Sequence, residues 1–272
     1  MLPAPSAADN AESQFLRGVN ARGLHSAAAA DLAGPRRAVV WIEVVIAGGG
    51  TTSAFPDDTT LDTVADTMAH LSFADDDGVR HFNRIYTEVT REVVRQLAAG
   101  GFEEPRFITV LDVRFAELYL DALRSPATAP RAWRVVFERR HHSLAPLRFA
   151  LAGMNAHINR DLAVALDVTC TRLGGTLDRD SPRCRDFLKI NGILAELMAQ
   201  AKSELFSRFD KLADIALGPL DDLCETWSIT VARDSAWTHG VILHRLGPGP
   251  ARDDALRSMD RTAALIGRLL LL

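Results

Sequence analysis

The amino-acid sequence predicts an all-α protein, a single multi-helix, bundle-like domain that follows a poorly ordered N-terminal extension. After residue 58, apolar residues recur at spacings of three and four along most of the chain. Gly and Pro stand between these runs, at positions where helices begin and end. No region alternates apolar and polar residues as a sheet would require. We therefore expect an extension or linker over 1–58 and a helical domain over 59–272, with about eight helices.

The helices are expected in a definite order along the chain. Thr60 offers an N-cap for the first, Gly100-Gly101 ends the second, and Pro105 opens the third. A loop with paired glycines is expected over 171–183. The predicted helices cover residues 60–71, 79–99, 105–125, 130–140, 147–166, 184–217 with a bend, 221–246 and 253–272.

The composition excludes several classes of protein. Apolar residues make up 47% and charged residues 24%, which is ordinary for a globular protein with a core. The 31 basic residues are scattered, so nothing suggests a nucleic-acid partner. Three widely spaced cysteines argue against a disulfide framework, and no run approaches the ~18 apolar residues of a membrane helix. We expect a cytoplasmic protein without a membrane span, and a homo-oligomer is left open.

The stretch 147–166, LRFALAGMNAHINRDLAVAL, reads as a helix buried on nearly all sides. It nevertheless carries Asn155, His157, Asn159, Arg160 and Asp161 within seven residues. Burying each polar group costs about 1–3 kcal/mol unless it finds a partner. Proteins usually tolerate such a cost where the polar groups serve a function or form a specific polar network. This helix is therefore the first candidate for a functional site.

The two polar pairs of this helix are expected to project in different directions. A step of about 100° per residue places one apolar stripe between them. His157 and Asp161 lie on one side of the stripe, and Asn155 and Asn159 flank its other side. A second, mostly small face would let a neighbouring helix approach closely, and it consists of Phe149, Ala152, Gly153 and Ala156.

His157 and Asp161 are one turn apart, with about 5–6 Å between their Cβ atoms. This spacing suits two ligands of one divalent metal, such as Zn or Fe, or a base with the carboxylate that orients it. No HExxH or ExxH pattern supplies a third metal ligand. Alternatively, both side chains hydrogen-bond neighbouring helices and hold the bundle in register.

Several motifs resemble a family of mostly actinobacterial proteins, the domain of unknown function 5995. They are LDVRFAELYLDAL, RAWRVVFERR, AGMNAHINRDL and ARDSAW, and they occur in the family's order between about Thr60 and Leu246. The resemblance implies a helical domain and a bacterial cytoplasmic setting. It implies no activity, so no catalytic residue is carried over from it. Members encoded near biosynthetic gene clusters would make a tailoring enzyme plausible.

Polar residues of other helices are candidate partners of the central helix. Asp112 interrupts the apolar pattern VLDVRFAELY, and Arg233 is the best candidate for its charged partner. Asp234 is likewise the candidate partner of His157. Arg233 and Trp237 are one turn apart and suit a cation–π pair, although an internal salt bridge is an equal alternative.

Three further polar or aromatic residues are expected to bind substrate. Asn83 and Tyr86 are three residues apart and can face one site, and Tyr119 lies two turns after Asp112. The simpler alternative is that Asp77 caps the helix and Tyr86 is a core ring.

We expect an enzyme of hydrolase-like or lyase/cyclase-like class, acting by acid–base or metal-assisted chemistry on a small, largely apolar molecule. A tailoring or cyclisation step in natural-product biosynthesis would suit it. No GxSxG, GxxxxGK[ST] or GxGxxG motif occurs in a suitable context, so no nucleotide cofactor is expected. The expected catalytic residues are His157, Asp161, Asp112, Arg233 and Asp234, and the expected substrate-binding residues are Asn155, Asn159, Asn83, Tyr86, Tyr119 and Trp237.

The alternative is a non-catalytic helical protein that binds an apolar ligand or a partner chain against aromatic residues such as Phe82, Phe115 and Trp237. If His157 is catalytic, its replacement by Ala should abolish turnover and leave the melting temperature nearly unchanged.

Overall fold

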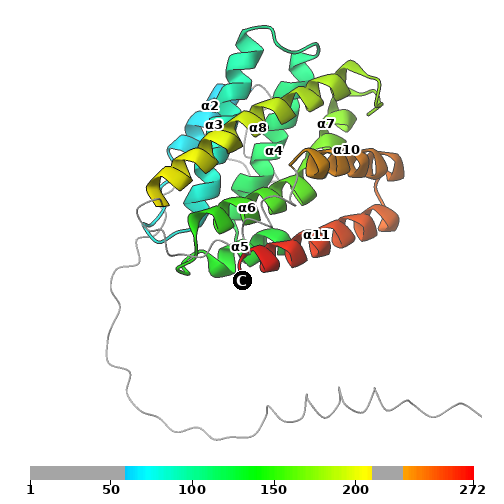
Figure 1. Ribbon diagram of the computed structural model, residues 1–272. Helices are drawn as coiled ribbons and strands as arrows, with labels where there is room; N and C mark the ends of the chain where they lie inside the picture. Colours follow the sequence, from blue (N-terminus) through cyan, green and yellow to red (C-terminus); the bar gives the residue numbers. More distant parts are fainter. Residues whose placement is uncertain (1–58, 210–228) are drawn as a thin grey trace, which may run out of the picture. The chain divides into compact units, whose positions relative to one another are not determined.

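The computed structural model describes residues 59–209 and 229–272, and it confirms the all-α prediction for them (Figure 1). No strand occurs in these ranges. The expectations for 1–58, and those for the segment 210–228, lie outside the described residues. The helices are α2 (Leu61–Ala69), α3 (Val79–Ala98), α4 (Pro105–Arg124), α5 (Arg131–Arg139), α6 (Pro146–Ala156), the π-helix η1 (His157–Asp161), α7 (Leu162–Leu173), α8 (Pro182–Phe209), α10 (Ile229–Leu246) and α11 (Pro250–Leu270).

The predicted boundaries of the first four helices agree with the observed ones to within two residues, whereas α7 runs to Leu173, beyond the predicted end of the central helix at 166. The Thr60 hydroxyl accepts a hydrogen bond from the backbone N–H of Thr63 and caps α2. Gly100, just past the end of α3, has a φ of 71°, the left-handed conformation that glycine adopts most readily. Pro105 and Pro146 stand in the first turns of their helices, where a missing N–H costs nothing.

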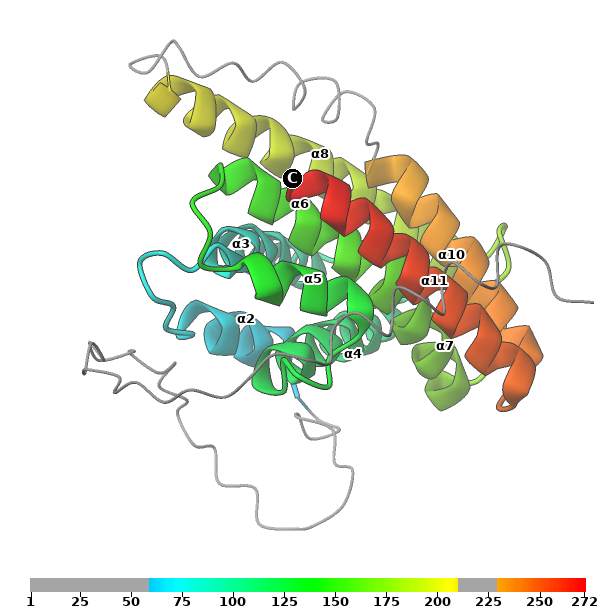
Figure 2. The same cartoon turned by 90° about the horizontal axis from the view of Figure 1, so that it is seen from below.

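The continuous segment formed by α6, η1 and α7 is the centre of the helical unit. Its parts contact α3, α4, α5, α10 and α11. Figure 2 shows α6 between α3 on one side and α11 on the other. Every residue from Phe149 to Ile158 is buried, as expected for the central helix. Side chains that leave this segment in different directions therefore enter different interfaces.

Small residues let α3 approach α6 closely, as the predicted small face requires. A Cβ atom added at Gly153 would lie 2.5 Å from the ring of Phe82. Ala152 and Ala156 of the same face are fully buried. A similar close approach joins α10 to α7, where a Cβ at Gly240 would lie 2.8 Å from Leu166.

Two carboxylates cap helices to which they do not belong. Asp186 of α8 accepts hydrogen bonds from the backbone N–H groups of Glu103 and Glu104, at the start of α4. Asp260 of α11 does the same for the first two residues of α5. The first N–H groups of a helix have no partner within it, so these contacts tie pairs of helices together.

Two remaining expectations concern cysteines and membranes. Cys170 and Cys184 are free and buried, which agrees with core thiols, and Cys224 lies outside the described residues. Within 59–209 and 229–272, no helix combines the length and apolar character needed to span a bilayer.

Candidate functional site

A small cavity of about 40 Å³ lies beside the junction of α6 and η1. It is lined by His157, Asp112 and Arg233 together with mostly apolar side chains, so three of the predicted catalytic residues meet at one place. The other lining residues are Phe82, Ile85, Tyr86, Val89, Thr90, Val93, Phe115, Met154, Ile158, Ile190 and Leu194.

His157 and Asp161 contact each other, as their spacing predicted. Nδ1 of His157 lies 3.2 Å from Oδ2 of Asp161. The same oxygen accepts a hydrogen bond of 2.7 Å from Trp133 Nε1, and Oδ1 accepts one of 2.7 Å from Arg160. The pair lies on the π-helical turn, a rare geometry that is frequent at functional sites.

The surroundings of the pair define its protonation. Burial opposes ionisation of Asp161, but Arg160 and His157 outweigh it and hold the pKa of the carboxyl below its ordinary value. Burial lowers the pKa of His157, against the opposing effect of Asp161. The imidazole is therefore neutral at pH 7, and an ionised Asp161 can only accept hydrogen bonds. The proton thus resides on Nδ1 and the lone pair on Nε2.

Aromatic rings fix the plane of the imidazole. The Phe115 ring stacks on His157, with a centroid distance of 3.4 Å and an interplanar angle of 7°. Tyr86 and Phe82 approach edge-on, at centroid distances of 4.6 and 5.5 Å. His157 is only 2% exposed, so the ring cannot turn towards solvent.

In the described part of the chain, the network around Asp161 leaves two buried atoms unsatisfied, Nε of Arg160 and Nε2 of His157, the latter on a side chain that lines the cavity. This Nε2 is fully buried and has no hydrogen-bond partner among the described residues. Leaving a buried polar atom unpaired costs about 1–3 kcal/mol. A polar group that entered the adjoining cavity could therefore gain a hydrogen bond here.

Asp112 and Arg233 supply the other charged groups of the cavity. Burial raises the pKa of Asp112 to about 7, although Arg233 acts against this shift. Burial likewise lowers the pKa of Arg233 to about 10, opposed by Asp112. Each group thus acts on the pKa of the other, and the pairing of Asp112 with Arg233 as charged partners stays a prediction.

The guanidinium of Arg233 is held by α8. Its Nε donates to Asn191 at 2.6 Å and its Nη2 to the carbonyl of Phe187 at 2.9 Å. It also lies over the Phe187 ring, 4.2 Å from the centroid. The sequence suggested Trp237 as the stacking partner. Trp237 instead packs on Phe187 and does not line the cavity.

The asparagine pair faces away from the cavity, as the angular separation of the two pairs indicated. Asn155 donates to the carbonyl of Ala263 in α11 at 2.7 Å, and its own carbonyl accepts from Asn159 at 2.9 Å. These bonds join α6 to α11. The expectation that Asn155 and Asn159 bind substrate in one pocket with His157 is not met by this geometry.

Asn83 and Tyr119 also form a structural link. Asn83 donates to the carbonyl of Met68 at 3.0 Å and accepts from the Tyr119 hydroxyl at 3.1 Å. Of the three substrate-binding candidates in α3 and α4, Tyr86 alone lines the cavity. Asp77 accepts from the backbone N–H of Val79, as its capping role predicted.

The predicted pairing of Asp234 with His157 is wrong. Asp234 has a 53% exposed side chain and pairs with Arg179, in the loop before α8. His157 instead contacts Asp161. Asp234 directly follows Arg233 in α10. The side chains of adjacent helical residues project in different directions, so the two do not reach the same neighbours.

Sequence reasoning missed two residues that hold the site. Trp133 donates to Asp161, and Phe187 supports Arg233. Trp133 lies in the family-like motif RAWRVVFERR, so its presence there was the available signal. Nothing in the spacing of α8 indicated Phe187.

The residues present do not fit a metal ion held jointly by His157 and Asp161. The two side chains face each other at hydrogen-bond distance, and both Asp161 oxygens already accept from other donors. In the part of the chain that the structure describes, no three His, Cys, Asp or Glu residues are grouped as metal ligands.

A family model whose description is "Family of unknown function (DUF5995)" matches residues 59–272, which includes every residue of the cavity. None of the curated proteins and none of the solved structures gives a match. The match agrees with the motif resemblance and covers most of the chain. The chain therefore belongs to the family of unknown function DUF5995.

Proposed function

We propose that this protein is an enzyme that transfers protons to and from a small, largely apolar molecule, with His157 as the general base. The unpaired, buried Nε2 of His157 beside the cavity is the observation that carries the proposal. Asp161 orients the ring and keeps the proton on Nδ1, while Phe115 fixes its plane. This is the arrangement that a histidine base requires.

Asp112 is the proposed general acid of the same site. A carboxyl whose pKa is raised to about 7 is partly protonated near neutral pH and can donate. Arg233 stabilises the carboxylate that remains after donation. Two titrating groups with different environments on one cavity are typical of acid–base pairs.

The cavity limits the substrate. Its volume of about 40 Å³ admits only molecules of a few heavy atoms, and its walls are mostly apolar. A larger substrate would require Ile190 and Leu194 of α8 to move outwards. We therefore expect a compact molecule that presents a hydroxyl group, or a C–H next to a carbonyl group, to the lone pair of Nε2.

Proton abstraction followed by protonation supports an elimination, isomerisation or cyclisation. The aliphatic hydroxyl of the lining, that of Thr90, donates to the carbonyl of Tyr86, so the site favours the lyase- or cyclase-like class over hydrolysis through an acyl-enzyme. A step of this kind would suit the tailoring of a natural product.

The tautomer of His157 is the first test, because it requires no substrate. Nitrogen NMR of the full chain with labelled histidine should show a neutral ring at pH 7, protonated on Nδ1. A proton on Nε2, or a charged ring at pH 7, would remove the lone pair and with it the proposal.

Exchange of α-protons is the second test. Small ketones such as acetone and butanone should exchange α-protons with D₂O faster in the presence of the protein than in buffer. The His157→Phe variant should lose the acceleration, because it keeps a stacked ring but no base. Arg257→Gln, on the exposed face of α11, is the matched control and should retain it.

The rival function is non-catalytic binding of an apolar ligand, which the apolar walls of the cavity favour. In that case the wild type and His157→Phe would bind the same small molecule with similar affinity, and neither would accelerate exchange.

A further inference from the structure

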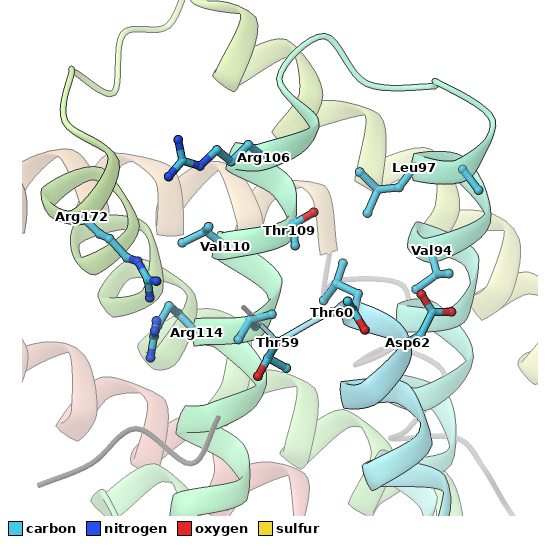
Figure 3. A pocket seen from close by; sticks show the side chains of 13 residues that line it. Thr59, Thr60, Asp62, Val94, Leu97, Arg106, Thr109, Val110, Arg114 and Arg172 are labelled. Carbon is cyan, nitrogen blue, oxygen red and sulfur yellow. The ribbon is translucent and has the colours of Figure 1, made fainter. Parts of the chain in front are cut away.

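A second and larger hollow, of about 550 Å³, opens at the start of α2 (Figure 3). Its volume falls within the range of ~300–1,000 Å³ that is usual for small-molecule sites. It shares no lining residue with the cavity beside His157. The function proposed above therefore leaves this hollow unexplained.

Three arginines gather at one end of the hollow. Arg106 and Arg114 come from α4 and Arg172 from the last turn of α7. In Figure 3 their guanidinium groups lie on the same side of Thr59. Arg114 donates to Glu117 at 2.6 Å, but a guanidinium has five N–H donors and can bind several acceptors at once.

Apart from Asp62, the rest of the hollow is lined by apolar and threonine side chains. Val94 and Leu97 of α3 and Val110 and Val113 of α4 are among its apolar lining residues, and Figure 3 shows Val110 on the side of the arginines. Figure 3 places Val94, Leu97 and Asp62 at the end away from the arginines. Because Asp62 carries a negative charge, that end would repel a second anionic group. The hollow thus has a cationic end and an acidic far end, with valine, leucine and threonine side chains on its walls.

We propose that this hollow binds an amphiphilic anion, a carboxylate or phosphate head group on an apolar tail. Arginine forks match both head groups, because each presents parallel oxygens to paired N–H donors. The tail would lie along Val110 and Val113 towards Leu97. The head group would interact chiefly with Arg106 and Arg172, whose side chains are exposed and reach it without rearrangement of the core.

Calorimetry of the full chain tests the proposal with three probes of one tail length: decanoate, decyl phosphate and 1-decanol. At least one of the two anions should bind with one-to-one stoichiometry, at least tenfold more tightly than the alcohol. The tighter of the two identifies the head group. Equal binding of acid and alcohol, or no binding of either anion, would overturn the proposal.

Variants separate this site from general attraction to a charged surface. Arg106→Gln and Arg172→Gln should each weaken the anion by about fivefold or more and leave 1-decanol unchanged. Arg257→Gln, with a 60% exposed side chain on α11, should change nothing. Unchanged affinity in both pocket variants would refute the assignment. His157→Phe should bind the anion normally, so failure of the proton-transfer proposal would not affect this result.

Discussion

The His157 ring fills core volume and also carries the unpaired nitrogen, so the substitution chosen decides what an experiment measures. The ring stacks on Phe115 and is 2% exposed. Removing it leaves a void, and comparable losses of buried rings cost about 3–5 kcal/mol. The expectation that His157→Ala spares the melting temperature therefore does not agree with the burial of the ring.

We predict that His157→Ala lowers the free energy of unfolding by about 2–5 kcal/mol, whereas His157→Phe lowers it by less. The phenyl ring retains the stack on Phe115, and only one of the three donors to Asp161 is lost. Urea unfolding followed by circular dichroism measures both. Equal stability of the Ala variant and the wild type would show that the ring is not packed as described.

Asp112 makes stability depend on pH in a direction opposite to most carboxylates. Its folded pKa of about 7 lies above the ordinary value of 3.8, so the folded state holds the proton more tightly between these values. Stability is therefore lost as the pH rises from about 4 through 7. The lowered pKa of His157 acts below pH 6.5 and is common to wild type and Asp112 variants.

We predict that Asp112→Asn gains stability over the wild type on going from pH 5 to pH 8.5, by on the order of a few kcal/mol. The amide cannot ionise, so it avoids the cost of a buried charge at high pH. Asp234→Asn is the control: Arg179 holds the pKa of Asp234 below its ordinary value of 3.8, so this carboxylate is ionised from pH 5 to 8.5 and its replacement should give a stability difference that does not change with pH. Parallel pH profiles for wild type and Asp112→Asn would contradict the raised pKa.

At the scale of the element, the sequence predicted the central helix but not its π-helical turn. Burial of 147–166 follows from its apolar residues, and the two directions of the polar pairs follow from helical periodicity. The angular analysis assumed α-helical geometry throughout. The same residue types can form an α-helical turn or a π-helical turn, so nothing in the sequence HINRD predicted the π-helical geometry.

Gly153 offers a test of the close approach between α3 and α6. We predict that Gly153→Ala costs about 1–3 kcal/mol, because the added Cβ would lie 2.5 Å from Phe82, which also contacts His157. The variant should also broaden the NMR signal of the His157 ring.

Gly192 of α8 is the matched control. A Cβ there meets no atom within 4 Å, so Gly192→Ala should stabilise the protein by up to about 1 kcal/mol through helix propensity alone. If both alanines stabilise, the small face of α6 does not govern packing against α3.

At the scale of the whole molecule, the sequence predicted fold class and helix order but few contacts between helices. Spacing along one helix identifies neighbours three and four residues apart, as for His157 and Asp161. It cannot identify partners on other helices, so Trp133 was missed and Asp234 was assigned wrongly. The contacts of Asp186 with the start of α4 could not be predicted from spacing either, because 82 and 83 residues separate the partners in the sequence.

These long-range caps indicate which contacts should make unfolding cooperative. Asp186 is fully buried and accepts from two backbone N–H groups at 3.0 and 2.7 Å. Its replacement by Ala would leave both groups at the start of α4 without a protein acceptor. Surface pairs such as Asp121 with Arg124, both about half exposed, contribute little to stability, because water can replace either partner.

We therefore predict that Asp186→Ala lowers the free energy of unfolding by about 2–4 kcal/mol, whereas Asp121→Ala changes it by less than about 1 kcal/mol. Native-state hydrogen exchange then decides how far the effect reaches. If α8 and α4 unfold as one unit with the central segment, the amides of α3, α4 and α6 should lose protection together in Asp186→Ala. Loss confined to the first turn of α4 would mean that this cap stabilises one helix end and does not couple α8 to the central segment.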